Sequence, residues 1–198
     1  MKFLSLSNAI KLMVAIGLIA IFALIVQSCQ PSKSTSSSEQ KALQSYAVKS
    51  LSKLYVLQNP PPQPVLSFKT VDGQSQKLSD LRGQYVLMNA WATWCAPCVQ
   101  EMPSLDRLAA QTNNADFQII TISLDKDASD IPPFFEKYGL KNLTDWHDGS
   151  LSLGAKLGAR GLPVTILYNR NGQEIARLEG TADWSSPEAL ALIDRLTE

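Results

Sequence analysis

The sequence has no excess of charge of either sign. Its 198 residues include 18 lysines and arginines and 18 aspartates and glutamates, so the formal net charge is zero. There is no basic run, the acidic residues are scattered, and no internal repeat is present. Because nucleic-acid-binding proteins present clustered positive charge, this composition gives no support for a nucleic-acid partner. The length allows one domain of ordinary size with additional segments.

Histidine and cysteine are also scarce, which limits metal chemistry. The chain has one histidine, His147, and three cysteines. A zinc site needs four ligands, and Cys95, Cys98 and His147 supply only three, so we expect no metal or other cofactor. Two thiolates and a histidine suffice for copper, so a copper-binding assembly chaperone remains an alternative. The surroundings of His147 favour a solvated loop residue.

Residues 1–29 have the pattern of a targeting segment and not of a folded domain. The apolar run Leu12–Val26 has the length of a signal-peptide core and is short for a membrane span of ~20 residues. It ends in Val-Gln-Ser-Cys, which resembles the lipobox of bacterial lipoproteins, with Cys29 as the lipidated residue. The alternative is an uncleaved signal anchor over Ala9–Gln27. Both interpretations predict a membrane-anchored chain that faces the periplasm or the cell exterior.

Residues 30–64 are expected to tether this segment to the folded domain. Residues 30–38 are rich in serine, as flexible linkers are. From Glu39 to Leu57, apolar residues recur at near-helical spacing, which predicts an amphipathic helix that packs on the domain or lengthens the stalk. Asn59–Pro64 contains four prolines, which cannot continue a helix and predict an extended spacer.

Residues 65–198 are expected to form an α/β domain, because apolar strand patterns alternate with helical ones. A turn at Asp72–Gln74 joins the first two strands into a hairpin. The order strand, helix, strand in the centre implies a right-handed parallel βαβ unit. The predicted strands are Val65–Thr70, Gln76–Leu78, Tyr85–Ala90, Phe117–Ser123, Thr165–Tyr168 and Glu174–Leu178, and the predicted helices are Val99–Ala110, Ile131–Tyr138, Leu151–Leu157 and Glu188–Leu196.

Cys95 and Cys98 stand two residues apart where a predicted strand passes into a helix. This spacing allows a small disulfide ring, and a helix N-terminus favours a thiolate on the first cysteine. A dithiol oxidoreductase needs one accessible thiolate to attack a disulfide and a second thiol to resolve the mixed disulfide. We expect Cys95 to attack and Cys98 to resolve. A purely structural disulfide is a poor alternative, because so small a ring adds little stabilisation.

Two neighbours of the pair have simple physical interpretations. Pro97 suits the first turn of a helix, where its missing N–H costs nothing. Trp94 lies beside the turn, where it either shapes a docking surface over the pair or fills the core.

The stretch Trp91–Cys98, followed by Glu101-Met102-Pro103, resembles the thioredoxin superfamily. More narrowly, it resembles the membrane-tethered TlpA/ResA branch of thiol:disulfide interchange proteins. The motifs Gly161–Thr165 and Gly180–Trp184 are most similar to TlpA itself. The resemblance implies a thioredoxin-like three-layer fold with a central mixed sheet, an N-terminal β-hairpin and an insertion in the central region, ahead of Pro163.

The same resemblance implies roles for individual residues. Pro163 matches the cis-proline that lies against the disulfide. Glu101 matches an acidic residue that sits near the pair and influences its ionisation, although an exposed carboxylate in the first helical turn is an equally simple interpretation. The expected substrate-docking residues are Trp94, Ala96, Pro97 and Leu162.

The residue between the cysteines bears on the direction of electron flow. Ala96 has no charge or ring donor to stabilise the Cys95 thiolate strongly, which favours a thiol pKa of ~7 over ~3.5 and therefore a reductase. The resemblance implies a membrane-embedded electron donor and protein thiol or disulfide clients, such as copper-assembly proteins of cytochrome oxidase or apocytochrome c. A peroxiredoxin-like peroxide reductase is the alternative, because Val65–Gly83 resembles those proteins too.

Overall fold

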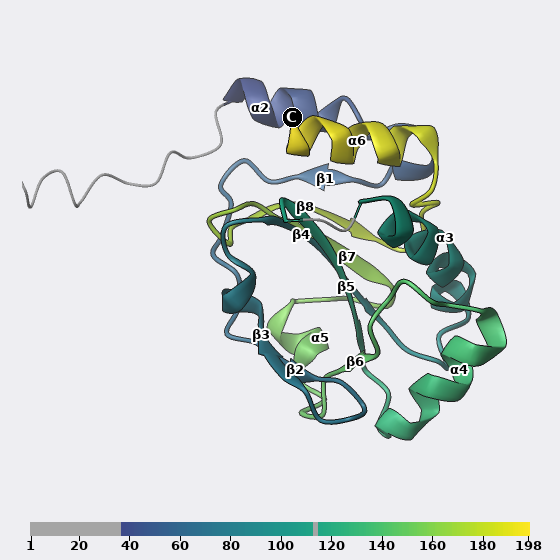
Figure 1. Cartoon of the computed structure of the whole chain (residues 1–198). Coiled ribbons are helices and arrows are strands. Elements are labelled where there is room, and N and C mark those ends of the chain that lie inside the picture. Colours follow the sequence, from purple (N-terminus) through teal and green to yellow (C-terminus); the bar gives the residue numbers. More distant parts are fainter. Residues whose placement is uncertain (1–36, 113–114) are drawn as a thin grey trace, which may run out of the picture. The chain divides into compact units, whose positions relative to one another are not determined.

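The computed structural model describes residues 37–112 and 115–198, which form a mixed sheet in the order β1-β8-β7-β4-β5-β6-β2-β3 (Figure 1). At its centre, β4 (Tyr85–Trp91) and β5 (Phe117–Ser123) are parallel and are joined by α3 (Ala96–Thr112). On the other side of β4, β7 (Val164–Tyr168) runs antiparallel. The sequence therefore predicted the central βαβ unit and the mixed sheet correctly.

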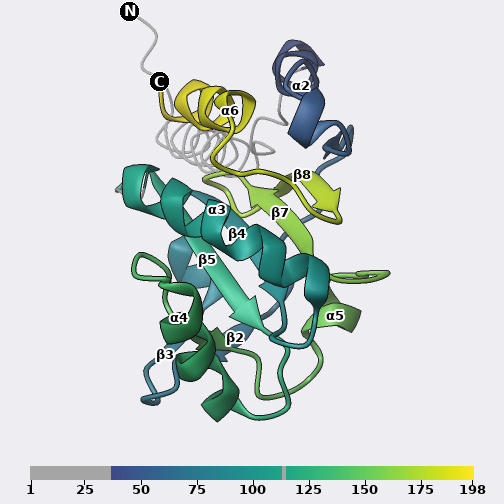
Figure 2. The same cartoon turned by 90° about the vertical axis from the view of Figure 1, so that its right-hand side faces the viewer.

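Helices cover both faces of this sheet and make three layers. Helices α3 and α4 (Ile131–Tyr138) lie on one face, and α5 (Leu153–Lys156) lies on the other (Figures 1 and 2). Strand β4 alternates between the two cores that result. Its Leu87 and Trp91 pack in the core that contains α3, and its Val86, Met88 and Ala90 pack in the core that contains α5.

The outer elements of the domain also follow the predicted pattern. Strands β2 (Ser67–Lys69) and β3 (Ser75–Lys77) form the expected antiparallel hairpin. Strand β8 (Glu174–Glu179) pairs antiparallel with β7, and α6 (Pro187–Thr197) begins after the capping residue Ser186, whose hydroxyl accepts from Ala189 N. The predicted three-layer α/β fold with a mixed sheet and an N-terminal hairpin is confirmed.

The central insertion lies between β5 and β7. It contains a 3-10 turn (Ala128–Asp130), α4, the short strand β6 (Trp146–His147) and α5. Helix α4 ends at Gly139, whose φ of +64° is a left-handed conformation that glycine adopts without strain. The buried Asp106 carboxylate of α3 holds the loop that follows, accepting from the backbone N–H groups of Lys141 (2.9 Å) and Asn142 (2.7 Å).

The segment before the predicted domain differs from the single helix expected over Glu39–Leu57. Helix α2 (Ser37–Gln44) ends early, a 3-10 turn η1 (Lys49–Leu51) follows, and β1 (Tyr55–Val56) pairs antiparallel with β8. Leu43, Leu51, Leu54 and Val56 are buried in the core that also contains Trp91 and Cys98. The compact unit thus begins well before Val65, because this segment buries its apolar side chains on the domain.

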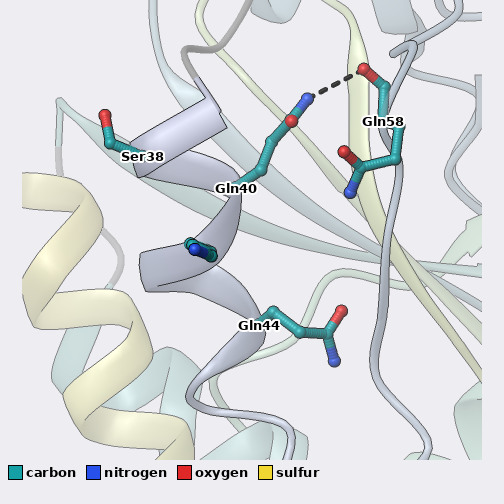
Figure 3. Close-up of a pocket in the computed structure, with 5 residues that line it drawn as sticks. Ser38, Gln40, Gln44 and Gln58 are labelled. Atoms are coloured by element: carbon teal, nitrogen blue, oxygen red, sulfur yellow. Dashed lines mark hydrogen bonds between the residues drawn. The ribbon is translucent and has the colours of Figure 1, made fainter.

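Glutamine side chains of α2 cover the outer edge of β1. The Gln44 amide donates to Leu54 O and accepts from Val56 N, both at 3.3 Å, as a neighbouring strand would. Figure 3 shows the Gln40 amide reaching the Gln58 carbonyl at 2.9 Å, beside a pocket of about 500 Å³. These bonds occupy backbone groups that an open sheet edge would offer to another chain.

The proline-rich stretch Asn59–Pro64 is also bound and is not a free spacer. Pro61 O accepts from Glu174 N at 2.9 Å, and Gln63 N donates to Gly172 O at 2.7 Å. Pro62 forms an isolated antiparallel bridge with Gln173. Prolines remove N–H donors, but these remaining groups are enough to bind the stretch along the β7–β8 hairpin.

Several predictions concern residues outside the described part. The apolar run Leu12–Val26, the lipobox with Cys29, and the serine-rich residues up to position 36 all lie there. Within residues 37–112 and 115–198, no helix combines the length and apolar character that crossing a membrane requires.

Replacement of Leu51 tests whether the N-terminal segment belongs to the compact unit. Leu51 is fully buried, so Leu51→Ala should lower the free energy of unfolding by about 2–5 kcal/mol. The matched control is Val48→Ala, because Val48 is exposed and its truncation should change stability by no more than about 0.5 kcal/mol. Urea unfolding measures both, and equal stability of the two variants would contradict the packing.

Candidate redox site

The cysteine pair lies where β4 passes into α3. Cys95 and Cys98 form a disulfide, with their Cα atoms 5.2 Å apart. Helix α3 begins at Ala96, and the Cys98 N–H donates to Cys95 Sγ at 3.3 Å. Once the disulfide is reduced, this N–H and the positive end of the helix dipole favour a thiolate on Cys95.

The two cysteines differ in exposure as their predicted roles require, because the attacking Cys95 must be more accessible than the resolving Cys98. Cys95 is 5% exposed and Cys98 is 0% exposed, so Cys95 is the more accessible residue of the pair. Trp94 is 69% exposed, which excludes its interpretation as a core aromatic. Ala96 and Pro97 are exposed beside it, so these residues border the disulfide at the surface.

Pro163 lies at the same end of the sheet as the cysteine pair. The register pairs Val164 of β7 with Ala90 of β4, just before the stretch that leads to Cys95. The Leu162–Pro163 peptide bond is cis, the isomer that the resemblance implies. Pro163 is buried, Leu162 is half-buried, and Pro163 O accepts from Gly180 N at 2.9 Å.

Glu101 is buried, with 2% of its surface exposed, so the interpretation as an exposed helix carboxylate is wrong. It lies three residues after Cys98, on the same face of α3. Its Oε1 accepts from Trp184 Nε1 (2.5 Å) and Ala182 N (3.1 Å), and its Oε2 accepts from Asn89 Nδ2 (3.2 Å). Burial raises the pKa of Glu101 from 4.5 to about 7, although the three hydrogen bonds oppose this rise.

Asn89 completes the polar cluster around Glu101. It is fully buried in β4, and its Nδ2 donates both to Glu101 and to Thr165 Oγ1 (2.9 Å) on β7. Its Oδ1 is buried without a hydrogen-bond partner. Sequence reasoning named Thr165 and Trp184 only as members of the motifs Gly161–Thr165 and Gly180–Trp184 and assigned no role to Asn89. A lone asparagine within an apolar strand is a signal that could have found Asn89.

A second buried carboxylate fixes the turn that leads into Cys95. Asp125, which follows β5, is 1% exposed. It accepts from Thr93 N (3.0 Å), Thr93 Oγ1 (2.7 Å) and Ser123 Oγ (2.6 Å). The two Thr93 donors therefore tie the turn to the end of β5, and the bond from Ser123 orients the Asp125 carboxylate. Sequence reasoning also missed Asp125, whose place just after a central strand was the available signal.

His147 lies on β6 and is half-buried, which differs from the solvated loop position expected for it. Its Nε2 lies 2.7 Å from Asp125 O. In the described part of the chain, no three side chains of histidine, cysteine, aspartate or glutamate are grouped so that they could hold a metal ion.

Comparisons with known proteins agree with this geometry. The model of the Redoxin family matches residues 59–193, which is more than half of the chain. The thiol-disulfide oxidoreductase ResA of Halalkalibacterium halodurans is 32% identical over 103 residues, covering 52% of this chain and 58% of that protein. ResA of Oceanobacillus iheyensis is 33% identical over 129 residues, covering 60% and 66%.

Solved structures share the fold. A proposed thiol:disulfide interchange protein DsbE from Chlorobium tepidum has a TM-score of 0.62 and 24% identity, covering 72% of this chain and 99% of that one. The sequence matches together with this structure confirm the resemblance to the thioredoxin superfamily and its ResA/TlpA-like branch. The chain spans about three fifths of the length of the first curated relatives it matches.

Glu101→Gln tests the buried carboxylate. Because the pKa of Glu101 is raised on folding, the native state binds more protons than the unfolded state between pH 4.5 and about 7. Its contribution to stability is therefore fully present below pH 4.5 and is lost as pH rises through 7. Relative to Glu101→Gln, the unfolding free energy of the natural chain should fall by about 3 kcal/mol from pH 4.5 to 8.

Urea unfolding at a series of pH values measures this difference. The introduced amide can still accept from Trp184, so the variant is expected to fold. A constant difference between the two proteins over this pH range would contradict the raised pKa.

Proposed function

Because the chain belongs to the Redoxin family, we propose that it is a thiol-disulfide oxidoreductase whose reacting atoms are the sulfurs of Cys95 and Cys98. The observation that carries this proposal is the placement of the pair. The two sulfurs are bonded at the start of α3, and the sulfur of Cys95, the more exposed residue, accepts an N–H from the helix terminus. A helix N-terminus of this kind lowers the pKa of a cysteine thiol and so prepares it for attack.

The reaction proceeds from the reduced pair in two exchange steps. The Cys95 thiolate attacks one sulfur of a client disulfide, and the other client sulfur leaves as a thiolate. The Cys98 thiol then loses its proton and attacks Cys95 Sγ, which breaks the mixed disulfide and releases the second client thiolate. Two electrons have passed to the client, and Cys95–Cys98 is the disulfide present in the structure.

Glu101 is suited to hold the proton that Cys98 loses. It lies one turn further along the same buried face of α3, and its pKa of about 7 lets it take up or release a proton near neutral pH. Burial favours the neutral acid and the donors Trp184 and Ala182 favour the carboxylate, so Glu101 can adopt both protonation states.

We further propose that the chain acts as a reductase. Ala96, between the cysteines, offers no charge to stabilise the Cys95 thiolate beyond what the helix supplies, and a moderately lowered thiol pKa suits a reductant. A reductase that is oxidised once per turnover needs an electron donor, and we propose one embedded in the membrane.

The proposed setting is outside the cytoplasm, at a membrane. The apolar run Leu12–Val26 and the lipobox-like residues ending at Cys29 support it. The proposed clients are proteins of cytochrome or cytochrome oxidase assembly, such as copper-assembly proteins or apocytochrome c, on the resemblance to the TlpA/ResA branch. Recovery of the chain in the cytosolic fraction of cells would contradict the setting and leave the thiol chemistry intact.

Trapping with Cys98→Ala tests the proposed function. Without the resolving thiol, Cys95 should retain clients as mixed disulfides, which a non-reducing gel separates and mass spectrometry identifies. The matched control is the double variant Cys95→Ser/Cys98→Ala, which should trap none. Equal capture by the two variants would contradict the assigned roles.

A turnover assay separates this function from peroxide reduction. With dithiothreitol as the donor, the natural chain should reduce insulin, and the variant lacking Cys95 should not. Rapid consumption of hydrogen peroxide without reduction of insulin would favour the peroxiredoxin-like alternative.

A further inference from the structure

The loop Gly180–Ser186, which joins β8 to α6, contacts several parts of the redox site. Gly180 N donates to Pro163 O at 2.9 Å. Ala182 N and Trp184 Nε1 both donate to Glu101 Oε1. Trp184 N also donates to Ser104 Oγ on α3 at 3.1 Å. The position of this loop therefore decides two of the three hydrogen bonds that Glu101 receives.

The N-terminal segment holds this loop from the other side. Ser50, in the η1 turn, donates through its hydroxyl to Asp183 O at 3.3 Å, and the same hydroxyl lies 2.8 Å from Ser186 Oγ. The Ser50 N–H donates to Glu188 Oε1 at 3.0 Å, at the start of α6. Ser50 thus bonds to the loop at Asp183 and Ser186, just after the two donors to Glu101.

Packing and backbone geometry indicate that the η1 turn is held firmly. Leu51 is fully buried in the same core as Trp184 and Cys98. Lys49 has a φ of +47°, a left-handed conformation that a side-chain-bearing residue adopts only where its surroundings impose it. The turn lies before residue 59, where the match to the Redoxin family begins, so the family match does not account for it.

We propose that Ser50 is a positioning residue for Glu101, through which the segment that precedes the family domain is coupled to the redox site. The proposal rests on the proposed function only in treating Glu101 as part of the reacting site. Ser50 acts indirectly, by holding the Gly180–Ser186 loop against α3.

The proposed coupling predicts the direction in which the pKa of Glu101 should change when Ser50 is replaced. Asn89 faces Glu101 from β4, Ala182 and Trp184 face it from the loop, and Cys98 precedes it on α3. Within the described residues, the interactions that shift the Glu101 pKa are burial and these hydrogen bonds. With Glu101 still buried, loss of loop donors removes stabilisation of the charged form, so the pKa of Glu101 should rise.

The experiment follows the titration of Glu101 directly, in the full-length chain in detergent micelles with the disulfide formed. Glutamate labelled with ¹³C at the carboxyl group gives one resonance per glutamate, and Glu101→Gln identifies that of Glu101. Ser50→Ala should move its titration midpoint up by about half a pH unit or more. Ser50→Thr, which keeps the hydroxyl at this half-buried position, should restore the natural midpoint.

Two further variants complete the test. Ser52→Ala is the matched control, because Ser52 is exposed two residues along the same turn, and it should leave the midpoint unchanged. Glu188→Gln weakens the bond to Ser50 N and should give a smaller upward shift, which provides a second variant if Ser50→Ala folds poorly.

The outcomes separate this proposal from the proposed function. If Ser50→Ala and Glu188→Gln both keep the natural midpoint, with or without a lower melting temperature, Ser50 is only structural and the proposal is overturned. The titration needs no turnover. A natural chain that fails to reduce insulin would therefore contradict the proposed function without affecting this result.

Discussion

The start of α3 is the point on which the rest of the structure depends. It must present Cys95 near the surface while one face of the helix is buried against the sheet. Strand β4 delivers the chain to this point, Asp125 fixes the turn before it, and the Gly180–Ser186 loop closes over its buried face. Each of these contacts limits how the helix terminus, which carries the cysteine pair, can move relative to the sheet.

This arrangement requires polar groups inside an apolar core, where an unpaired charge is costly. Glu101 avoids being an unpaired buried charge in two ways. It accepts hydrogen bonds from three donors, and its pKa near 7 means that it is partly neutral at neutral pH. Asn89 is satisfied on one side only, since its Oδ1 has no partner. Because Glu101 has a pKa near 7 and Asn89 has an unpaired oxygen, this cluster can take up a proton released nearby. A cluster in which every charge is paired would take up a proton less readily.

The sequence predicted the parts of the molecule that depend on local pattern. Apolar runs located β4 and β5, the left-handed glycine ended α4 as expected, and the spacing of Cys95 and Cys98 located the site. Residues 39–57 were harder, because helical spacing does not reveal that Tyr55 and Val56 will pair with a strand more than a hundred residues away. Glu101 was ambiguous for a related reason, since its burial depends on a loop far along the chain.

A redox titration of the cysteine pair tests the central claim most directly. The full-length chain is equilibrated in dithiothreitol buffers of graded potential, and free thiols are counted by alkylation and mass spectrometry. The account predicts one reversible two-electron transition of Cys95 and Cys98, with a midpoint more negative than about −180 mV, as a reductase requires. A midpoint well above that value would contradict the direction, and a pair that cannot be cycled would contradict the redox site itself.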